Sequence, residues 1–248
     1  MRILFADIDD TMTTDGFIPS ETFAALWEAR RAGLRIVPVT GRPAGWCDHI
    51  ARMWPVDGVI GENGAFYFRK TAEGIVRHHV QGEDERRRNR QRLEAVREAV
   101  LREVPGCGIA SDQAYREYDL AVDFCEDVPR LPWSEVDRIV GVFERHGAVA
   151  KVSSIHVNGW FGDFDKLSMA RRYIREMDGC ELEDEPTAYG FVGDSPNDEP
   201  MFAAFQRSFG VANIRVFFDR LRHRPAVVVE ECGGAGFAQV VRLVLEQG

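Results

Sequence analysis

Acidic side chains occur in two short segments that lie far apart in the sequence. Asp7 and Asp9 directly follow an apolar run at the N-terminus, and Asp194 and Asp198 lie in the segment Gly-Asp-Ser-Pro-Asn-Asp, residues 193–198. Both segments come where a predicted strand ends. Because sites in open α/β sheets form at the carboxyl ends of the strands, we expect these four carboxylates to lie together. Their mutual repulsion in a cleft of low dielectric favours a bound divalent cation.

The residue types indicate which cation this is. Oxygen ligands suit magnesium, which commonly takes one or two carboxylates and keeps water and substrate phosphate as its other ligands. Zinc fits less well, because none of the six histidines occurs in a zinc-binding spacing such as H-E-x-x-H. We therefore predict Mg²⁺ as the cofactor.

Such a site suits phosphoryl transfer. A carboxylate beside a metal can attack phosphorus, and a second carboxyl two residues later can act as general acid and then as general base. Thr40, in a turn after the second predicted strand, can donate a hydrogen bond to a phosphoryl oxygen. Lys166, at the start of a predicted helix, can supply a positive charge to the phosphoryl group during transfer.

The elements that position these residues alternate along the chain. Apolar runs predict strands, and segments of helical spacing follow them, which indicates an α/β fold with a parallel sheet. The middle of the chain breaks this pattern, so we predict a Rossmann-like parallel-sheet core formed by residues 1–82 and 158–248, with an inserted α+β cap domain at residues 83–157. The expected strands are 2–7, 34–39, 59–60, 65–68, 75–80, 120–124, 148–157, 188–192, 209–211 and 226–229, and the expected later helices are 83–104, 133–146, 166–177, one from residue 196 and 236–245.

Composition limits the possible partners. The 248 residues carry a net charge of −9, which disfavours a surface that coats nucleic acid. The five cysteines are dispersed, as is typical of free thiols in a reducing compartment. We expect no signal peptide, because acidic residues interrupt the N-terminal apolar run, and no transmembrane helix, because no apolar stretch is long enough for one. We therefore predict a cytoplasmic protein whose partner is a small phosphorylated molecule, with no nucleic acid and no membrane, and we infer no protein partner.

Taken together, the motifs resemble those of the haloacid dehalogenase superfamily of phosphatases. Two further segments resemble its Cof-like branch, which includes sucrose-phosphate and mannosyl-phosphoglycerate phosphatases and carries a large α+β cap between the second and third motifs. The four superfamily motifs match as Asp-Ile-Asp-Asp-Thr at 7–11, Val-Thr-Gly-Arg at 39–42, Lys166 and residues 193–198, and the two branch segments match as Gly-Glu-Asn-Gly-Ala at 61–65 and Gly-Val-Ala-Asn at 210–213.

The resemblance implies a role for each motif residue. Asp7 is implied as the nucleophile, which becomes an aspartyl-phosphate, and Asp9 as the acid and base. The phosphoryl group is implied to be bound by Thr40, Gly41 and Lys166, with Asn197 orienting the lysine or the phosphate. The Asp7 carboxylate, the Asp9 backbone carbonyl and Asp194 are implied to hold magnesium. Asp198 is implied to assist without binding the ion directly.

The function predicted from these residues is a phosphoric monoester hydrolase that acts on a sugar or polyol phosphate. Two alternatives stay open at this point. One is a phosphomutase similar to phosphomannomutase, and the other is a non-catalytic phosphate-binding module, against which the second aspartate, Asp9, argues. Substrate selection is expected from polar residues at cap strand edges, namely Arg116, Tyr118, Ser154 and His156.

Overall fold

The centre of the protein is a parallel β-sheet built from both ends of the chain. The computed structural model describes residues 1–153 and 155–247. Five strands pair in the order β12-β11-β10-β1-β2. In the register of β1 with β10, Ala6 lies opposite Val192, so both strands end at the same edge. The strands are β1 (Ile3–Ala6), β2 (Arg35–Pro38), β10 (Tyr189–Gly193), β11 (Arg207–Gly210) and β12 (Val227–Val228).

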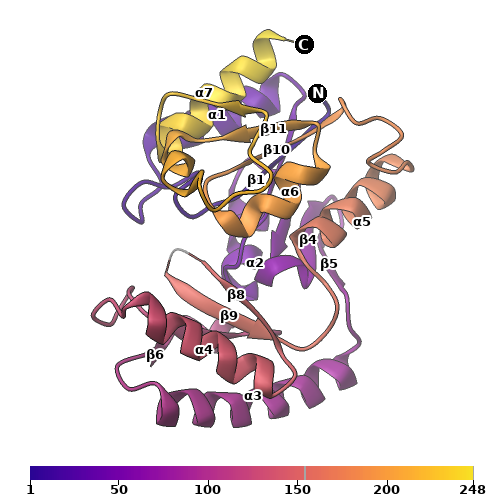
Figure 1. Cartoon of the computed structure of the whole chain (residues 1–248). Helices are drawn as coiled ribbons and strands as arrows, with labels where there is room; N and C mark the ends of the chain where they lie inside the picture. The colour runs from indigo at the N-terminus through magenta and orange to yellow at the C-terminus, as the bar shows by residue number, and fades with distance from the viewer. Residues whose placement is uncertain (154, 248) are drawn as a thin grey trace.

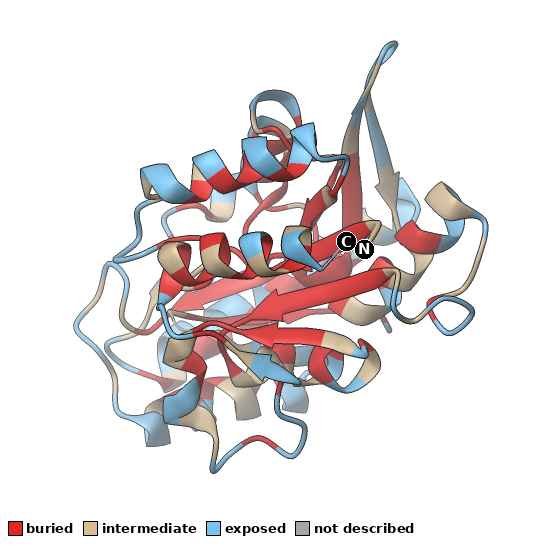
Figure 2. Ribbon diagram, turned by 90° about the horizontal axis from the view of Figure 1, so that it is seen from above, coloured by how far each residue is buried: buried red, intermediate tan, exposed pale blue. Residues whose placement is uncertain are grey.

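Helices cover both faces of this sheet. Leu4 and Ala6 of β1 pack into one hydrophobic cluster with α1 (Ser20–Arg31), α2 (Ala44–Met53) and α7 (Gly233–Glu246). Ile3 and Phe5 point to the opposite face, where they pack against α5 (Lys166–Asp178) and α6 (Glu199–Ala204). Side chains alternate in this way along any strand, and burial on both faces explains the unbroken apolar run of β1. Figure 2 shows the strands and the inward faces of the helices buried.

A short antiparallel sheet joins the core to the rest of the chain. It consists of β3 (Val59–Gly61), β4 (Phe66–Thr71) and β5 (Gly74–His79), with the 3₁₀ turn η1 (Glu62–Gly64) between β3 and β4. A parallel bridge between Val39 and Ile60 connects it to the end of β2. The turn η1 is thereby placed beside the segment that follows β2.

The inserted segment folds around a hydrophobic core of its own, and the predicted α/β core with an α+β cap is confirmed. A four-stranded antiparallel sheet, in the order β6-β7-β9-β8, packs against two helices. Figure 1 shows this cap below the parallel-sheet core, with α3 and α4 on the outer side. Its elements are α3 (Glu83–Glu103), β6 (Gly108–Ile109), the turn η2 (Gln113–Tyr115), β7 (Leu120–Asp123), α4 (Trp133–Arg145), β8 (Val149–Val152) and β9 (His156–Trp160).

Three expected elements differ from those observed. The single strand expected at 148–157 is wrong, since β8 and β9 form an antiparallel pair; Ser153 closes the turn by donating its backbone N–H to the His156 carbonyl at 2.8 Å. The helix expected from residue 196 begins as the 3₁₀ turn η3 (Pro196–Asp198) and continues as α6, and the last helix begins at Gly233. Another 3₁₀ turn, η4 (Ala212–Phe217), precedes β12.

All five cysteines are free thiols, as expected. Within residues 1–153 and 155–247, every helix falls short of the length and hydrophobicity that a membrane span requires.

Candidate active site

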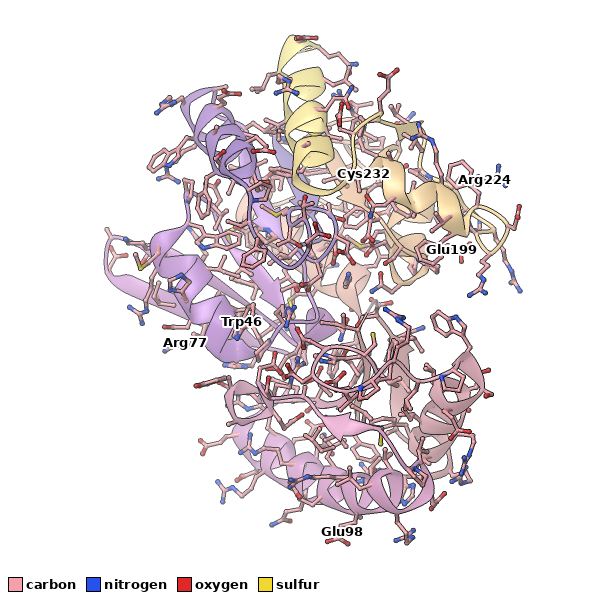
Figure 3. All side chains as sticks on the ribbon, turned by 90° about the vertical axis from the view of Figure 1, so that its left-hand side faces the viewer. Trp46, Arg77, Glu98, Glu199, Arg224 and Cys232 are labelled. Carbon is pink, nitrogen blue, oxygen red and sulfur yellow. The ribbon has the colours of Figure 1, made fainter. Side chains whose placement is uncertain are left out.

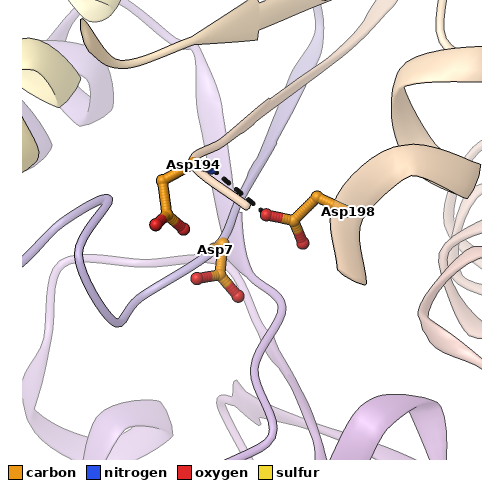
Figure 4. Close-up of side chains that lie close together, drawn as sticks. All are labelled: Asp7, Asp194 and Asp198. Atoms are coloured by element: carbon orange, nitrogen blue, oxygen red, sulfur yellow. Dashed lines mark hydrogen bonds between the residues drawn. The ribbon is translucent and has the colours of Figure 1, made fainter. Parts of the chain in front are cut away.

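Three buried carboxylates meet at the carboxyl edge of the parallel sheet. Asp7 follows β1 and Asp194 follows β10, while Asp198 ends η3 and turns back toward them (Figure 4). The backbone N–H of Asp194 donates to Asp198 Oδ2 at 3.2 Å, which fixes this return. One carboxylate oxygen from each residue lies within 4.8 Å of the others, so the three could hold a metal ion. Three of the four acids that were expected to lie together therefore meet in the fold.

Lys166 inserts its ammonium group between two of the three acids. It is the first residue of α5, whose N-terminus is capped by Asp165 through a 2.7 Å hydrogen bond from the Ser168 backbone N–H. Its Nζ donates to Asp7 Oδ1 at 2.6 Å and to Asp198 Oδ1 at 2.8 Å. Asp198 therefore orients the lysine, while Asn197, for which an orienting role was expected, accepts a hydrogen bond from the Ser195 hydroxyl at 2.7 Å.

When all three acids are ionised, the charges in this cluster do not balance without a further cation. Burial raises the pKa of Asp7 to about 8; Asp198 and Asp9 add to the rise, and Lys166 opposes it. Burial also raises the pKa of Asp194, and the carboxylate of Asp7 adds to this rise. Burial alone would lower the pKa of Lys166, but Asp198 and Asp7 raise it instead, so this group stays charged. The three carboxylates supply oxygen ligands, and the one ammonium offsets only part of their negative charge. This combination fits a hard divalent cation.

Two residues that the sequence did not indicate hold Asp194 in place. The Thr11 hydroxyl donates to Asp194 Oδ1 at 3.2 Å, and the Asn213 amide donates to Asp194 Oδ2 at 3.3 Å. The same Asn213 amide also donates to the backbone carbonyl of Asp10. Both residues lie within segments that the sequence had already matched to family motifs, but for neither did the sequence indicate a contact with Asp194.

Asp9 lies at the rim of the cluster and pairs with an arginine. The guanidinium of Arg42 donates to Asp9 through Nε at 3.1 Å and through a terminal nitrogen at 2.9 Å. The same guanidinium lies 3.4 Å from Glu126 of the cap and 4.5 Å above the ring of Trp46. Trp46 is labelled in Figure 3, on the core near its boundary with the cap. Arg42 thus connects Asp9, the expected general acid and base, to the cap. It was not among the predicted site residues, although it directly follows Thr40 and Gly41.

Thr40 and Gly41 form a loop beside the acids. Thr40 is buried; its backbone N–H donates to the Ile60 carbonyl at 2.9 Å, and its hydroxyl oxygen accepts the Arg42 N–H at 3.0 Å. Gly41 lines the same small cavity as Asp7, Asp9 and Lys166. Asn197 and Ser195 complete the core side of that cavity.

The four cap residues expected to select substrate have different positions. Arg116 and His156 line the cavity. The guanidinium of Arg116 is already engaged by Asp112, Asp119 and the Gly41 carbonyl, and His156 Nε2 lies 2.8 Å from the Glu126 carboxylate. Tyr118 is absent from the cavity lining, because its ring stacks on His79 and its hydroxyl bonds to the Gln81 backbone. Ser154 lies outside the described residues.

The N-terminal segment is similar to a known protein family, and the whole chain is similar to known proteins in sequence or in fold. Residues 4–88 match the family model described as haloacid dehalogenase-like hydrolase. A phosphoglycolate phosphatase from Pyrobaculum islandicum is 27% identical over 250 residues, which cover 98% of this chain and 96% of that protein. A solved structure from Thermoplasma acidophilum matches with a TM-score of 0.74 at 20% identity, over 100% of this chain and 99% of that one. The sucrose-phosphatase of Synechocystis sp. PCC6803 matches with a TM-score of 0.67 at 16% identity, over 98% of each chain.

The fold, the placement of the four motifs and these matches agree. Residues 4–88 resemble the haloacid dehalogenase-like hydrolases, and the fold is similar to that of the solved structures over the whole chain. The family model and the name of the Pyrobaculum islandicum relative support a phosphatase, as the motifs predicted.

Proposed function

We propose that this protein is a phosphatase of the haloacid dehalogenase type, a magnesium-dependent phosphomonoester hydrolase that acts on a small phosphorylated metabolite through an aspartyl-phosphate on Asp7. The observation that supports this best is the arrangement of Asp7, Asp194 and Asp198 within 4.8 Å of one another, with the Lys166 ammonium on the nucleophile. A phosphate-binding module would have no use for a buried carboxylate aimed at the ligand, because two anions repel each other in such a cavity.

In this proposal each residue of the site has one task. Lys166 holds one oxygen of Asp7 at 2.6 Å, and the other oxygen attacks phosphorus. Asp9 protonates the departing alkoxide and later takes a proton from the water that releases phosphate. Thr40 and Gly41 bind the phosphoryl oxygens. Asp7, Asp194 and the Asp9 carbonyl would hold magnesium, and Asp198 would support this arrangement without binding the ion directly. When bound, the ion would neutralise negative charge on the phosphoryl group.

The substrate is proposed to be a sugar or polyol phosphate. The cavity is small and polar, and the cap contributes Arg116, His156 and Asn158 to its wall. Phosphoglycolate is a second candidate, because the relative from Pyrobaculum islandicum carries that name and matches nearly the whole chain. Both are small molecules that a cap could enclose, which would exclude water during transfer. We also propose a cytoplasmic location and a division into a core at residues 1–82 and 158–248 and a cap at residues 83–157. Strand β9 of the cap sheet ends at Trp160, so it extends past this boundary.

A screen against phosphorylated metabolites tests the proposal. Purified protein with magnesium is incubated with sugar phosphates, polyol phosphates and phosphoglycolate, and released orthophosphate is measured, with Asp7→Asn as the control. We expect release from one of these compounds and none from the variant. Activity that requires a sugar bisphosphate would identify a mutase, and no release from any compound would refute the hydrolase.

A further inference from the structure

The turn η1 has a backbone conformation that side chains normally avoid. Glu62 and Asn63 have φ angles of +40° and +56°, in the left-handed region, and Gly64 follows with φ +103°. Residues other than glycine adopt such angles at a cost, and they persist only where the surroundings fix them, often at functional sites. Neither residue is at the surface, because both side chains are buried.

The carboxylate of Glu62 holds this turn in place. It is 0% exposed and accepts the backbone N–H of Ala44, the first residue of α2, at 2.9 Å. It also accepts three successive N–H groups from the cap loop before β7, with that of Tyr118 the nearest at 2.6 Å. Burial raises the pKa of Glu62, with Asp119 adding to the rise, whereas Arg116 and the backbone N–H groups lower it. Four donors around two oxygens tie the turn to both α2 and the cap.

The backbone of η1 also touches both phosphate-handling segments. Glu62 N–H donates to the Arg42 carbonyl at 3.2 Å, and Asn63 N–H donates to the Thr40 carbonyl at 3.1 Å. A Cβ at Gly64 would lie only 2.0 Å from the Asp165 carbonyl, so the turn packs directly against the start of the helix that carries Lys166. The Asn63 side chain therefore projects from a fixed backbone between these two segments.

The Asn63 amide is a buried donor without a partner. Its side chain is 8% exposed and lines the same cavity as Asp7, Asp9 and Lys166. The amide lies against the phosphate loop, because a Cβ at Gly41 would be 3.3 Å from both Nδ2 and Oδ1 of Asn63. Among residues 1–153 and 155–247, Nδ2 has no hydrogen-bond acceptor. A buried N–H without an acceptor is costly, which is why such groups in a cavity point to a ligand.

We propose that Asn63 binds the substrate directly, by donating its Nδ2–H to an oxygen of the phosphoryl group. The inference rests on the proposed phosphatase function and adds a residue to its site. The amide supplies a hydrogen-bond donor without adding charge to the cavity. Lys166, the cation in contact with the nucleophile, already donates hydrogen bonds to two carboxylates. The rigid turn keeps that donor in position before substrate arrives, which is how preorganised donors stabilise charge that develops during transfer.

Two substitutions test this proposal without straining the turn. Asn63→Gly removes the amide and suits the left-handed backbone, and Asn63→Asp keeps the shape but replaces the donor with an anion. Orthophosphate binding is measured by titration calorimetry with magnesium, and KM and kcat are measured with an aryl phosphate. For Asn63→Gly we expect orthophosphate affinity to fall about tenfold to hundredfold, as for loss of a hydrogen bond to a charged group. For Asn63→Asp we expect no measurable binding.

The matched control is Asn89→Asp in α3. Asn89 is a buried asparagine of the cap whose amide donates to Gln81 and to the Phe161 carbonyl, and it is absent from the cavity lining. Its variant should bind orthophosphate as the wild type does. Wild-type phosphate affinity and KM in a folded Asn63→Gly or Asn63→Asp protein would overturn the inference. Wild-type protein without phosphatase activity would instead refute the proposed function, so the two failures are distinguishable.

Discussion

Magnesium binding should tighten steeply as pH rises from about 6 to about 8, because the ion must displace a proton from Asp7. The pKa of Asp7 is raised to about 8 by burial, and a metal ligand has to be deprotonated. With that pKa, the ionised fraction is about 1% at pH 6 and about one half at pH 8, so the apparent Kd should fall about 50-fold, or ~2.3 kcal/mol. Asp194, whose pKa burial also raises, steepens the dependence.

The sign for stability follows from the same shift. In the metal-free protein the folded-state pKa of Asp7 lies above its unfolded value, so its contribution to stability is fully present below about pH 4 and is lost as pH rises through about 8. Magnesium removes this loss by occupying the ionised site. The increase in Tm that magnesium produces should therefore grow between pH 6 and pH 8.

The assay is calorimetric titration of metal-free protein with magnesium, in two buffers that differ in ionisation enthalpy, so that released protons are counted. At about pH 6.5 we expect at least one proton released per ion bound. The control is Asp7→Asn, which removes the raised carboxyl and should flatten the pH dependence. Equal Kd values at pH 6 and pH 8, with no proton release, would refute the assignment of Asp7 as a ligand with a raised pKa.

Three other predictions concern the acid, the turn and the choice of cation. Asp9→Asn should abolish turnover of a sugar phosphate yet give a burst of aryl alcohol from an aryl phosphate in rapid-mixing assays, because an aryl oxygen leaves without protonation; equal rates to wild type on both substrates would make Asp9 structural. Glu62→Gln should lower the free energy of unfolding by about 3 kcal/mol, because the amide nitrogen of glutamine is a donor and would face the buried backbone N–H groups that the carboxylate accepts. Urea denaturation measures this against Glu98→Gln on the outer face of the cap (Figure 3), and equal stabilities would contradict it. Calcium should inhibit in steady-state assays, because its larger coordination shell can engage both oxygens of the nucleophile, and full activity with calcium alone would contradict this.

The sequence predicted the core well because parallel strands that are buried on both faces form unbroken apolar runs. The run of apolar residues before Asp7 and the run before Asp194 are both buried on two faces, so their ends had to meet at one edge. The strand expected at 148–157 failed because the turn at Ser153 has neither glycine nor proline to mark it in the sequence, and hydrogen bonds between Ser153 and His156 close it instead.

The supporting residues could not be predicted in the same way, because their partners are distant in the sequence. Glu62 accepts N–H groups from residues more than fifty positions away, and nothing near it in the chain indicates this. Thr11 contacts Asp194, which lies 183 positions later in the chain. Tyr118 was expected at the cavity because it lies near a cap strand edge, but its ring packs with His79 in the joint between core and cap. Side-chain direction in such loops is set by tertiary packing.

Trapping the covalent intermediate tests the central claim most directly. Wild-type protein with magnesium is mixed with an aryl phosphate, quenched in acid within milliseconds, digested and analysed by mass spectrometry, alongside Asp9→Asn to slow dephosphorylation and Asp7→Asn as the blank. The proposed mechanism predicts one phosphoryl group on the peptide that contains Asp7, accumulating further in Asp9→Asn and absent from Asp7→Asn. Phosphate release at the wild-type rate by Asp7→Asn, or a phosphoryl group carried on any other residue, would contradict it.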